Sequence, residues 1–219
     1  MKYVNTDMKN FLILMVFGIC LSLTSCGSSD KYVLIETEYG NMKVLLYNET
    51  PQHRDNMVKL AKAGFYDDLL FHRVINGFMV QGGDPNSKEA PADRRLGGGG
   101  PGYQIPAEIG LPHIKGAIAA ARNSNPEKKS SGSQFYLVHG RKMTDAQLDG
   151  IQNQKGITYN EEQRKLYREL GGTPQLDQDY TVFGEVVEGM DVIDKIAAVE
   201  TAPGDRPVKD VKMKIRMTK

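Results

Sequence analysis

Hydrophobic and polar residues alternate in short runs along most of this chain, a spacing typical of β-strands with one buried face. The run YVLIETEYGNMKVLLY, residues 32–47, alternates on either side of a Gly40-Asn41 pair that favours a tight turn. We therefore expect an antiparallel hairpin that turns at Gly40 and Asn41. Later apolar runs, separated by glycine and proline, predict further short strands. They cover residues 70–74, 78–81, 116–121, 134–139, 180–187 and 208–217.

Two segments have the spacing of amphipathic helices. In TPQHRDNMVKLAKAG, residues 50–64, Thr50 is the expected N-cap, Pro51 the first helical residue and Gly64 the stop. A second, shorter helix is expected at residues 190–198, with its apolar residues facing a core. Many short strands with few helices indicate a closed β-barrel or a β-sandwich.

One polar segment does not fit this β pattern. Residues 141–174 are helix-like, with Asn160 as the expected N-cap of EEQRKLYREL and Gly171 as its stop. We interpret the segment as an insertion between two strands. Long connections of this kind are either functional or tolerated additions. The sequence leaves both alternatives open and favours the second.

The first 25 residues differ from the rest. The first ten residues carry Lys2 and Lys9, and the apolar run FLILMVFGICLSL of 13 residues follows. This pattern is typical of a signal peptide and is too short for a membrane-spanning helix in the mature protein. Translation from Met8 instead of Met1 would give a more compact signal, and the sequence leaves both starts open.

The residues LTSC, 23–26, resemble a bacterial lipobox, in which the cysteine is acylated and becomes the mature N-terminus. We therefore expect a lipid on Cys26, and the alternative is an ordinary secretory signal with a chance cysteine. Residues 1–25 are then a lipoprotein signal peptide, residues 26–31 a short anchor linker and residues 32–219 one globular domain.

Charge and cysteine content narrow the function classes. Without the two lysines and one aspartate of residues 1–25, the 28 basic and 27 acidic residues of the chain become 26 of each. A domain with no net charge lacks the basic footprint of nucleic-acid binding. Cys20 lies in the signal peptide and Cys26 would be lipidated, so the mature domain has neither a free thiol nor a disulfide.

Other candidate motifs are weak. The four histidines have no metal-type spacing, so we expect no metal site. Gly97, Gly99 and Gly102 match a dinucleotide motif by letter, but no helix follows, and a loop that passes close to another surface is the better interpretation. The serines of residues 130–133 lack a nucleophile elbow, so a hydrolase is not favoured.

Three separated motifs, taken in order, resemble the cyclophilin family of peptidyl-prolyl cis/trans isomerases. They are FHRVINGFMVQGGD at residues 71–84, SGSQFY at residues 131–136 and TVFGEVVEGMDV at residues 181–192. The resemblance covers residues 32–219 apart from the insertion. It implies a mainly β fold, a closed eight-stranded antiparallel barrel capped by two helices. It also implies isomerase activity without a cofactor.

The resemblance assigns a catalytic role to Arg73. An X-Pro peptide bond rotates over a barrier of about 18–20 kcal/mol, because resonance gives the C–N bond partial double-bond character. The guanidinium of the matching arginine donates to the prolyl nitrogen as the bond twists, so no nucleophile is needed. This accounts for a single cation within so apolar a motif.

The resemblance also assigns a substrate-binding set. Gln81 matches the residue that binds the substrate carbonyl group, and the lining of the proline pocket and its surroundings matches Phe78, Met79, Ala121, Arg122, Gln134, Tyr136, Leu176 and Tyr180. Strand alternation independently places Tyr136 on the face of Gln134, with Phe135 and Leu137 turned to the core. Three positions depart from the best-known members. Arg122 replaces an asparagine, Gln175 a tryptophan and Tyr180 a histidine.

The sequence thus predicts a lipid-anchored isomerase of the cell envelope, periplasmic or outer-membrane associated, that assists the folding of exported proteins. Its expected partners are proline-containing segments of those proteins and, through the lipid, a membrane. We expect a monomer. The alternative is a non-catalytic module that binds proline-containing peptides, or an anchored chaperone.

Overall fold

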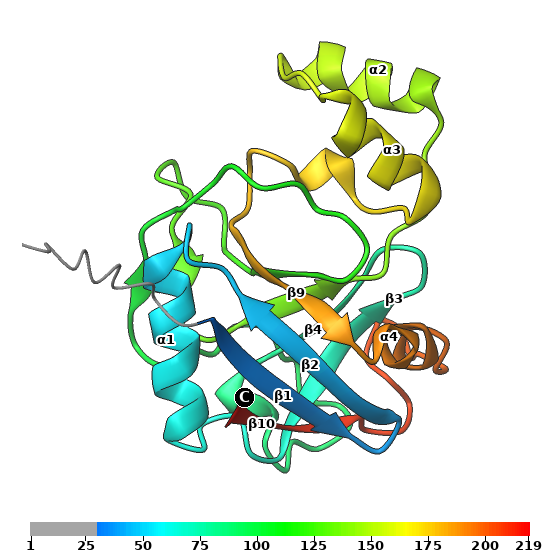
Figure 1. Cartoon of the computed structure of the whole chain (residues 1–219). Helices are drawn as coiled ribbons and strands as arrows, with labels where there is room; N and C mark the ends of the chain where they lie inside the picture. Colours follow the sequence, from blue (N-terminus) through cyan, green and yellow to red (C-terminus); the bar gives the residue numbers. More distant parts are fainter. Residues whose placement is uncertain (1–29) are drawn as a thin grey trace, which may run out of the picture.

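The alternating runs close into one barrel in the computed structural model, which describes residues 30–219 (Figure 1). The predicted signal peptide, the lipobox and Cys26 lie outside the described residues. Eight strands follow one another around the barrel in the order β1-β10-β3-β4-β8-β6-β9-β2, and every neighbouring pair is antiparallel. The predicted fold class is confirmed.

The barrel strands are β1 (Lys31–Thr37), β2 (Gly40–Leu46), β3 (Leu69–Ile75), β4 (Met79–Gly82), β6 (Ala117–Ala120), β8 (Phe135–Val138), β9 (Val182–Glu188) and β10 (Lys212–Thr218). The short strands β5 (Gln104–Ile105) and β7 (Ser130–Ser131) form a separate pair. The α-helices are α1 (Pro51–Lys62), α2 (Asp145–Lys155), α3 (Glu161–Glu169) and α4 (Met190–Ala197). Two 3₁₀ turns are η1 (Pro85–Ser87) and η2 (Pro174–Leu176). Each of the α-helices within residues 30–219 is too short or too polar to span a bilayer.

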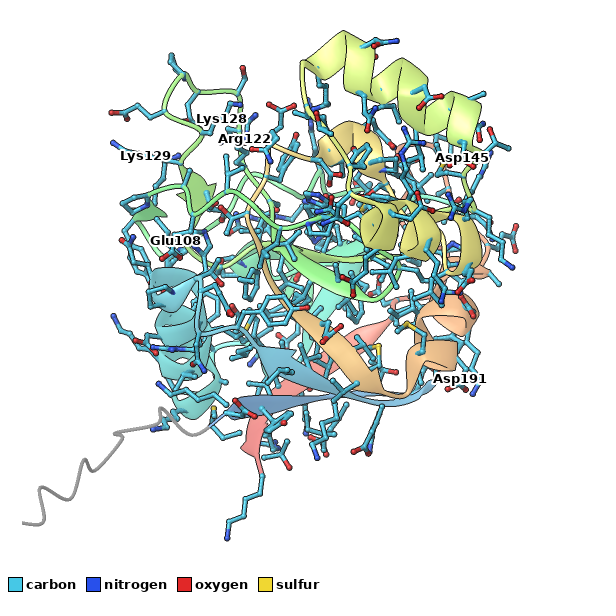
Figure 2. All side chains as sticks on the ribbon, turned by 45° about the horizontal axis from the view of Figure 1, so that its top comes forward. Glu108, Arg122, Lys128, Lys129, Asp145 and Asp191 are labelled. Atoms are coloured by element: carbon cyan, nitrogen blue, oxygen red, sulfur yellow. The ribbon has the colours of Figure 1, made fainter. Side chains whose placement is uncertain are left out.

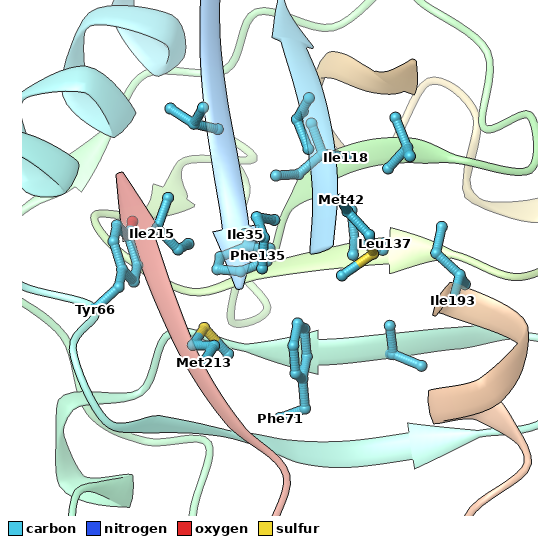
Figure 3. Close-up of a cluster of buried hydrophobic side chains, with 14 of the residues drawn as sticks. Ile35, Met42, Tyr66, Phe71, Ile118, Phe135, Leu137, Ile193, Met213 and Ile215 are labelled. Atoms are coloured by element: carbon cyan, nitrogen blue, oxygen red, sulfur yellow. The ribbon is translucent and has the colours of Figure 1, made fainter. Parts of the chain in front are cut away.

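The barrel interior is filled by apolar side chains from the inward positions of the strands (Figure 3). Helices α1 and α4 lie on opposite sides of the strands and add their buried faces to this core (Figure 1). They are the two capping helices that the sequence predicted. Among the largest fully buried side chains are Ile35, Met42, Phe71, Phe135 and Leu137.

The hairpin of β1 and β2 turns two residues earlier than predicted. Its turn is residues 38–39, and Gly40 pairs with Thr37 as the first residue of β2, so the prediction of a turn at Gly40 and Asn41 is wrong. The Thr37 hydroxyl donates to the Gly40 carbonyl oxygen at 2.8 Å and stabilises the earlier turn. Gly40 serves the packing of α4 instead, because a Cβ atom there would lie 2.9 Å from Val192.

Helix α1 begins at Pro51 as predicted, but a remote residue caps it. Thr50 occupies the N-cap position without a side-chain hydrogen bond. The Glu108 carboxylate instead accepts the backbone N–H groups of Gln52 and His53, at 3.1 and 3.0 Å. A carboxylate at a helix N-terminus is favourable because it meets both the free N–H groups and the positive end of the helix dipole.

The segment between β8 and β9 contains two helices where the sequence predicted one. Helix α3 follows Asn160, whose side chain accepts the Gln163 backbone N–H at 2.8 Å, and Gly171 with φ of 89° follows its end, so both predicted boundaries are confirmed. Helix α2 was not predicted, although a capping box begins at Thr144 and Gly156 ends the helix in the left-handed conformation. Together, α2 and α3 form a lobe outside the barrel (Figure 1).

Candidate active site

One cavity of about 830 Å³ brings together residues that are far apart in the sequence. Nine of the residues predicted from the sequence line it: Arg73, Phe78, Met79, Gln81, Ala121, Arg122, Tyr136, Leu176 and Tyr180. Gln134, the remaining predicted residue, lines an adjoining hollow of about 400 Å³ that shares Gln81, Ala121 and Arg122 with the cavity. The two hollows therefore form one continuous surface.

A β-bulge turns Arg73 toward the cavity. The pairing of β3 with β4 shifts register between Phe71 and Arg73, which places one extra residue between them. Phe71 and Val74 therefore both face the barrel core, and Arg73 faces outward. Arg73 is the cross-strand partner of Gln81, and the two side chains share one face of the sheet.

An acidic residue holds the Arg73 guanidinium from one side. Its Nε donates to Asp205 Oδ2 at 3.2 Å, and both side chains are a little over 40% exposed. The Asp205 carbonyl oxygen also accepts the Val74 N–H at 2.8 Å, so Asp205 is attached to β3 through backbone and side chain. No other described residue accepts a hydrogen bond from this guanidinium, which leaves its terminal N–H groups available to a ligand.

The floor of the cavity is apolar. Met79 and Tyr136 are almost completely buried, and Phe78, Leu176 and Tyr180 are partly buried and pack against them. Phe135 and Leu137 belong to the barrel core, so the predicted alternation along β8 is confirmed. Burial, with Tyr180 and Asp177 nearby, raises the pKa of Tyr136 well above its usual value, so its hydroxyl stays protonated.

Gln134 connects Gln81 to the glycine-rich loop. Its Oε1 accepts from Gln81 Nε2 at 3.1 Å, while its own Nε2 donates to the carbonyl oxygens of Gly97 and Gly99, at 3.0 and 2.7 Å. The buried Asp84 carboxylate accepts the N–H groups of both glycines. A Cβ atom on Gly99 would lie 2.1 Å from Asp84, so the interpretation of a closely approaching loop is confirmed.

The family model for cyclophilin-type peptidyl-prolyl cis-trans isomerases matches residues 32–217. The chain belongs to this family. It is therefore a peptidyl-prolyl cis-trans isomerase, and family membership favours catalysis over the non-catalytic binding module that the sequence left open.

Relatives and solved structures agree with this family. Proteins of Staphylococcus aureus (strain USA300) and Staphylococcus saprophyticus named "Putative peptidyl-prolyl cis-trans isomerase" are each 35% identical to this cyclophilin-type chain. The matches cover 82% and 86% of this chain, and 87% and 91% of the relatives. A Cryptosporidium parvum cyclophilin-type isomerase has the same fold, with a TM-score of 0.65 and 22% identity over 87% of this chain and 98% of that one.

Arg122, where better-known cyclophilins carry asparagine, covers one edge of the cavity. Its guanidinium carbon lies 4.7 Å from the centre of the Tyr180 ring, and its Nε donates to the Asp179 carbonyl oxygen at 2.8 Å. Figure 2 shows Arg122 beside Lys128 in the loop that follows β6. Arg122 and Tyr180, two of the departures from the family pattern, thus form one contact.

The sequence analysis missed one wall of the cavity. Two loops form it, residues 92–97 and 202–206, and the Arg206 guanidinium joins them by donating to carbonyl oxygens of residues 90–94. His72 also lines the cavity and was not predicted. Burial lowers the pKa of its imidazole, and neither ring nitrogen has a hydrogen-bond partner among the described residues. The two loops were missed because their sequences have no periodic pattern. His72 lies within the first motif, but the sequence analysis gave it no role.

A serine, a histidine and a carboxylate line up elsewhere in this cyclophilin fold. The Ser130 hydroxyl lies 3.0 Å from His53 Nε2, and His53 Nδ1 lies 2.6 Å from the Glu108 carboxylate. Ser130 is only 1% exposed, so its oxygen is closed to a substrate. The group fastens α1 to β7 and to the loop that carries Glu108. Within residues 30–219 no cluster of three or more histidine, cysteine or acidic residues is arranged to hold a metal ion.

Proposed function

We propose that this isomerase turns over X-Pro bonds in exported proteins at the cell envelope, with Arg73 as its catalytic residue. The observation that carries the catalytic assignment is the half-exposed Arg73 guanidinium at the edge of an apolar pocket, held through Nε alone. The residues around it supply a place for the proline ring and hydrogen-bonding groups for the backbone on either side.

The reaction needs the prolyl nitrogen to lose its resonance with the carbonyl group. As the C–N bond twists, the nitrogen lone pair localises and becomes a hydrogen-bond acceptor. A terminal N–H of Arg73 then donates to that nitrogen, an interaction that the planar amide does not offer. A charge-assisted hydrogen bond made only in the transition state contributes about 1.5–3 kcal/mol, or roughly ten- to a hundredfold in rate.

The pocket floor orients the substrate. Met79, Tyr136 and Leu176 present apolar surface to the proline ring, and Gln81 offers an amide group to the preceding carbonyl oxygen. Gln134 holds the Gln81 amide in place. A related solved structure was determined in the presence of the dipeptide Ala-Pro, which is consistent with a ligand of this class.

Replacement of Arg73 by alanine tests the mechanism. We expect kcat/KM on a proline-containing tetrapeptide to fall ten- to a hundredfold in a protease-coupled assay, with an unchanged circular dichroism spectrum. Arg216→Ala is the matched control, because Arg216 Nε also lies 3.2 Å from a carboxylate, that of Glu36, but Arg216 does not line the cavity. Equal turnover in Arg73→Ala and the parent would contradict the mechanism.

The proposed location rests on the LTSC pattern, which lies outside the described residues. Strand β1 begins at Lys31, so five residues from Gly27 reach at most about 18 Å and would hold the domain close to a membrane. We expect wild-type protein in cells to carry a lipid label and enter the detergent phase. Cys26→Ser should lose both properties. Wild-type protein in the aqueous phase would overturn the anchor.

A further inference from the structure

A buried carboxylate lies where the insertion, residues 141–174, meets the active-site cavity. Asp177 directly follows Leu176 of the proline pocket and is 3% exposed. Its Oδ1 accepts from the His113 backbone N–H at 2.8 Å and lies 2.7 Å from His113 Nδ1. Its Oδ2 accepts from the hydroxyls of Tyr159 and Tyr167, at 2.8 and 2.6 Å. Four donors therefore surround the two oxygens of this carboxylate.

The chain of hydrogen bonds continues through His113 into the proline pocket. His113 is completely buried, and its Nε2 lies 2.9 Å from the Tyr136 hydroxyl. Because the Asp177 carboxylate oxygen accepts, a proton of the His113 ring lies on Nδ1, and Nε2 on the opposite side of the ring shares a hydrogen bond with the Tyr136 hydroxyl. The two rings are stacked with centres 6.0 Å apart, so both the hydroxyl and the ring face of Tyr136 are fixed.

The insertion supplies half of the donors to Asp177. Tyr159 precedes α3 and Tyr167 lies within it, and both pack against the fully buried Leu148 of α2. Burial and the Asp177 charge raise the pKa of both phenols, which keeps them protonated as donors. The end of α2 adds a further attachment, since Lys155 Nζ donates to the Asp177 carbonyl oxygen at 2.8 Å.

No lysine or arginine contacts the Asp177 side chain among the described residues, so the buried carboxylate depends on its hydrogen bonds from His113, Tyr159 and Tyr167. Loss of donors from a buried carboxylate is unfavourable, and the group would move toward water. Such a movement would displace Leu176 and release His113, and Tyr136 would lose its partner. The insertion therefore has a direct physical route to the shape of the pocket.

We propose that the insertion is a positioning element, which holds the proline pocket in shape through the relay of Tyr159 and Tyr167, Asp177, His113 and Tyr136. The inference rests on the proposed function, because it takes Tyr136 and Leu176 as the floor of the proline site. It replaces the sequence-based interpretation of residues 141–174 as a tolerated addition.

The test removes the two insertion hydroxyls and keeps their rings. In the full-length protein, Tyr159→Phe/Tyr167→Phe should raise KM for a proline tetrapeptide roughly three- to tenfold and change kcat less than twofold, because a loosened pocket weakens ground-state and transition-state binding alike. Asp145→Asn is the control, since it removes ion pairs of the insertion without contact to the relay. Arg73→Ala should instead lower kcat and change KM little. This contrast separates failure of the relay from failure of the catalytic assignment.

A double-mutant cycle decides whether the hydroxyls act through Tyr136. Tyr136→Phe breaks the relay at its other end, so its effect on KM should overlap with that of Tyr159→Phe/Tyr167→Phe instead of multiplying with it. If Tyr159→Phe/Tyr167→Phe does not fold, the single variant Tyr159→Phe takes its place in the same cycle with Tyr136→Phe. Multiplying effects, or an unchanged KM in a folded Tyr159→Phe/Tyr167→Phe protein, would overturn the proposal.

Discussion

The barrel buries its core with aliphatic and aromatic side chains, whereas the insertion joins the rest of the protein largely through polar groups. The barrel cluster unites residues from most strands and from α1 and α4 (Figure 3). Among the described residues, the insertion has three buried cluster members, Leu148, Tyr159 and Tyr167, and partly buried apolar side chains pack around them. Two of the three carry hydroxyls directed at Asp177. Apolar packing tolerates some change of shape, whereas removing a partner from a buried polar group costs free energy, because that group stays shielded from water.

The residues of the candidate active site are therefore held in place in two different ways. Arg73 and Gln81 are held opposite each other by the pairing register of β3 and β4. The sheet hydrogen bonds determine this register, and a shift by one residue would turn each side chain to the other face. Leu176 and Tyr180 lie on a connection between α3 and β9, so they depend on what packs behind that connection. We infer that the two parts of the site respond differently to mutation.

The largest effect is expected from a cavity in the barrel. Phe135 is 1% exposed and contacts Tyr66 and Phe71 edge to face. Phe135→Ala should lower the free energy of unfolding by about 3–5 kcal/mol, measured by urea denaturation. We expect one transition for all residues, because every strand shares this core. A loss below about 1 kcal/mol would show that the barrel does not depend on close packing.

A smaller, local effect is expected from the matching change in the insertion. Leu148 is completely buried but touches only the small cluster around Tyr159 and Tyr167. Leu148→Ala should lower the free energy of local opening of α2 and α3 by about 2 kcal/mol or more. Native-state hydrogen exchange measures the free energy of opening of each helix and strand separately. If amide exchange became faster by the same factor in the barrel strands, the insertion and the barrel would open as one unit.

Acid should weaken the barrel rather than the insertion. Burial lowers the pKa of His53, His72 and His139 below 6.5, and residues 141–174 contain no histidine. The unfolded chain restores pKa values near 6.5, so it binds more protons than the folded protein as the pH falls. This part of the free energy of unfolding is present above about pH 6.5 and should decrease as the pH falls from there toward 5.

Urea midpoints at pH 7.5, 6 and 5 measure that decrease, and a histidine variant identifies its source. His72→Met replaces the imidazole with an apolar, non-titrating side chain of similar size, at a site where the ring nitrogens have no hydrogen-bond partner among the described residues. The midpoint of this variant should depend less on pH than that of the parent. An identical pH dependence of the two midpoints would show that His72 does not contribute to the loss of stability in acid.

The smallest effect is expected on the outer surface of the insertion. Asp145 lies at the start of α2 and pairs with Arg164 and Arg168, and its side chain is 54% exposed (Figure 2). Exposed ion pairs are screened by water and salt and contribute little. Asp145→Asn should leave the unfolding midpoint and the tetrapeptide KM unchanged. A clear loss of stability that salt abolishes would show that surface charge holds the lobe.

Several features of the protein could be predicted from local sequence alone. Alternation predicted the strands and the two faces of β8, and caps predicted α1 and α3, because side-chain direction and helix ends depend on residues close in the chain. The motifs led to the barrel and to the ten residues along the two hollows. Helix α2 also had a local signal, the capping box at Thr144, which the sequence analysis passed over.

Only the tertiary structure decided the contacts between residues distant in sequence. Asp205 lies 132 residues from Arg73, Glu108 caps a helix that begins 57 residues earlier, and Asp177 reaches His113 across 64 positions. The sequence pattern around an aspartate or glutamate does not indicate its hydrogen-bond partner. The partner depends on which two distant segments of the chain the fold brings together. The sequence therefore determined which residues line the cavity and the adjoining hollow, and the packing of the insertion and loops determined what holds those residues in place.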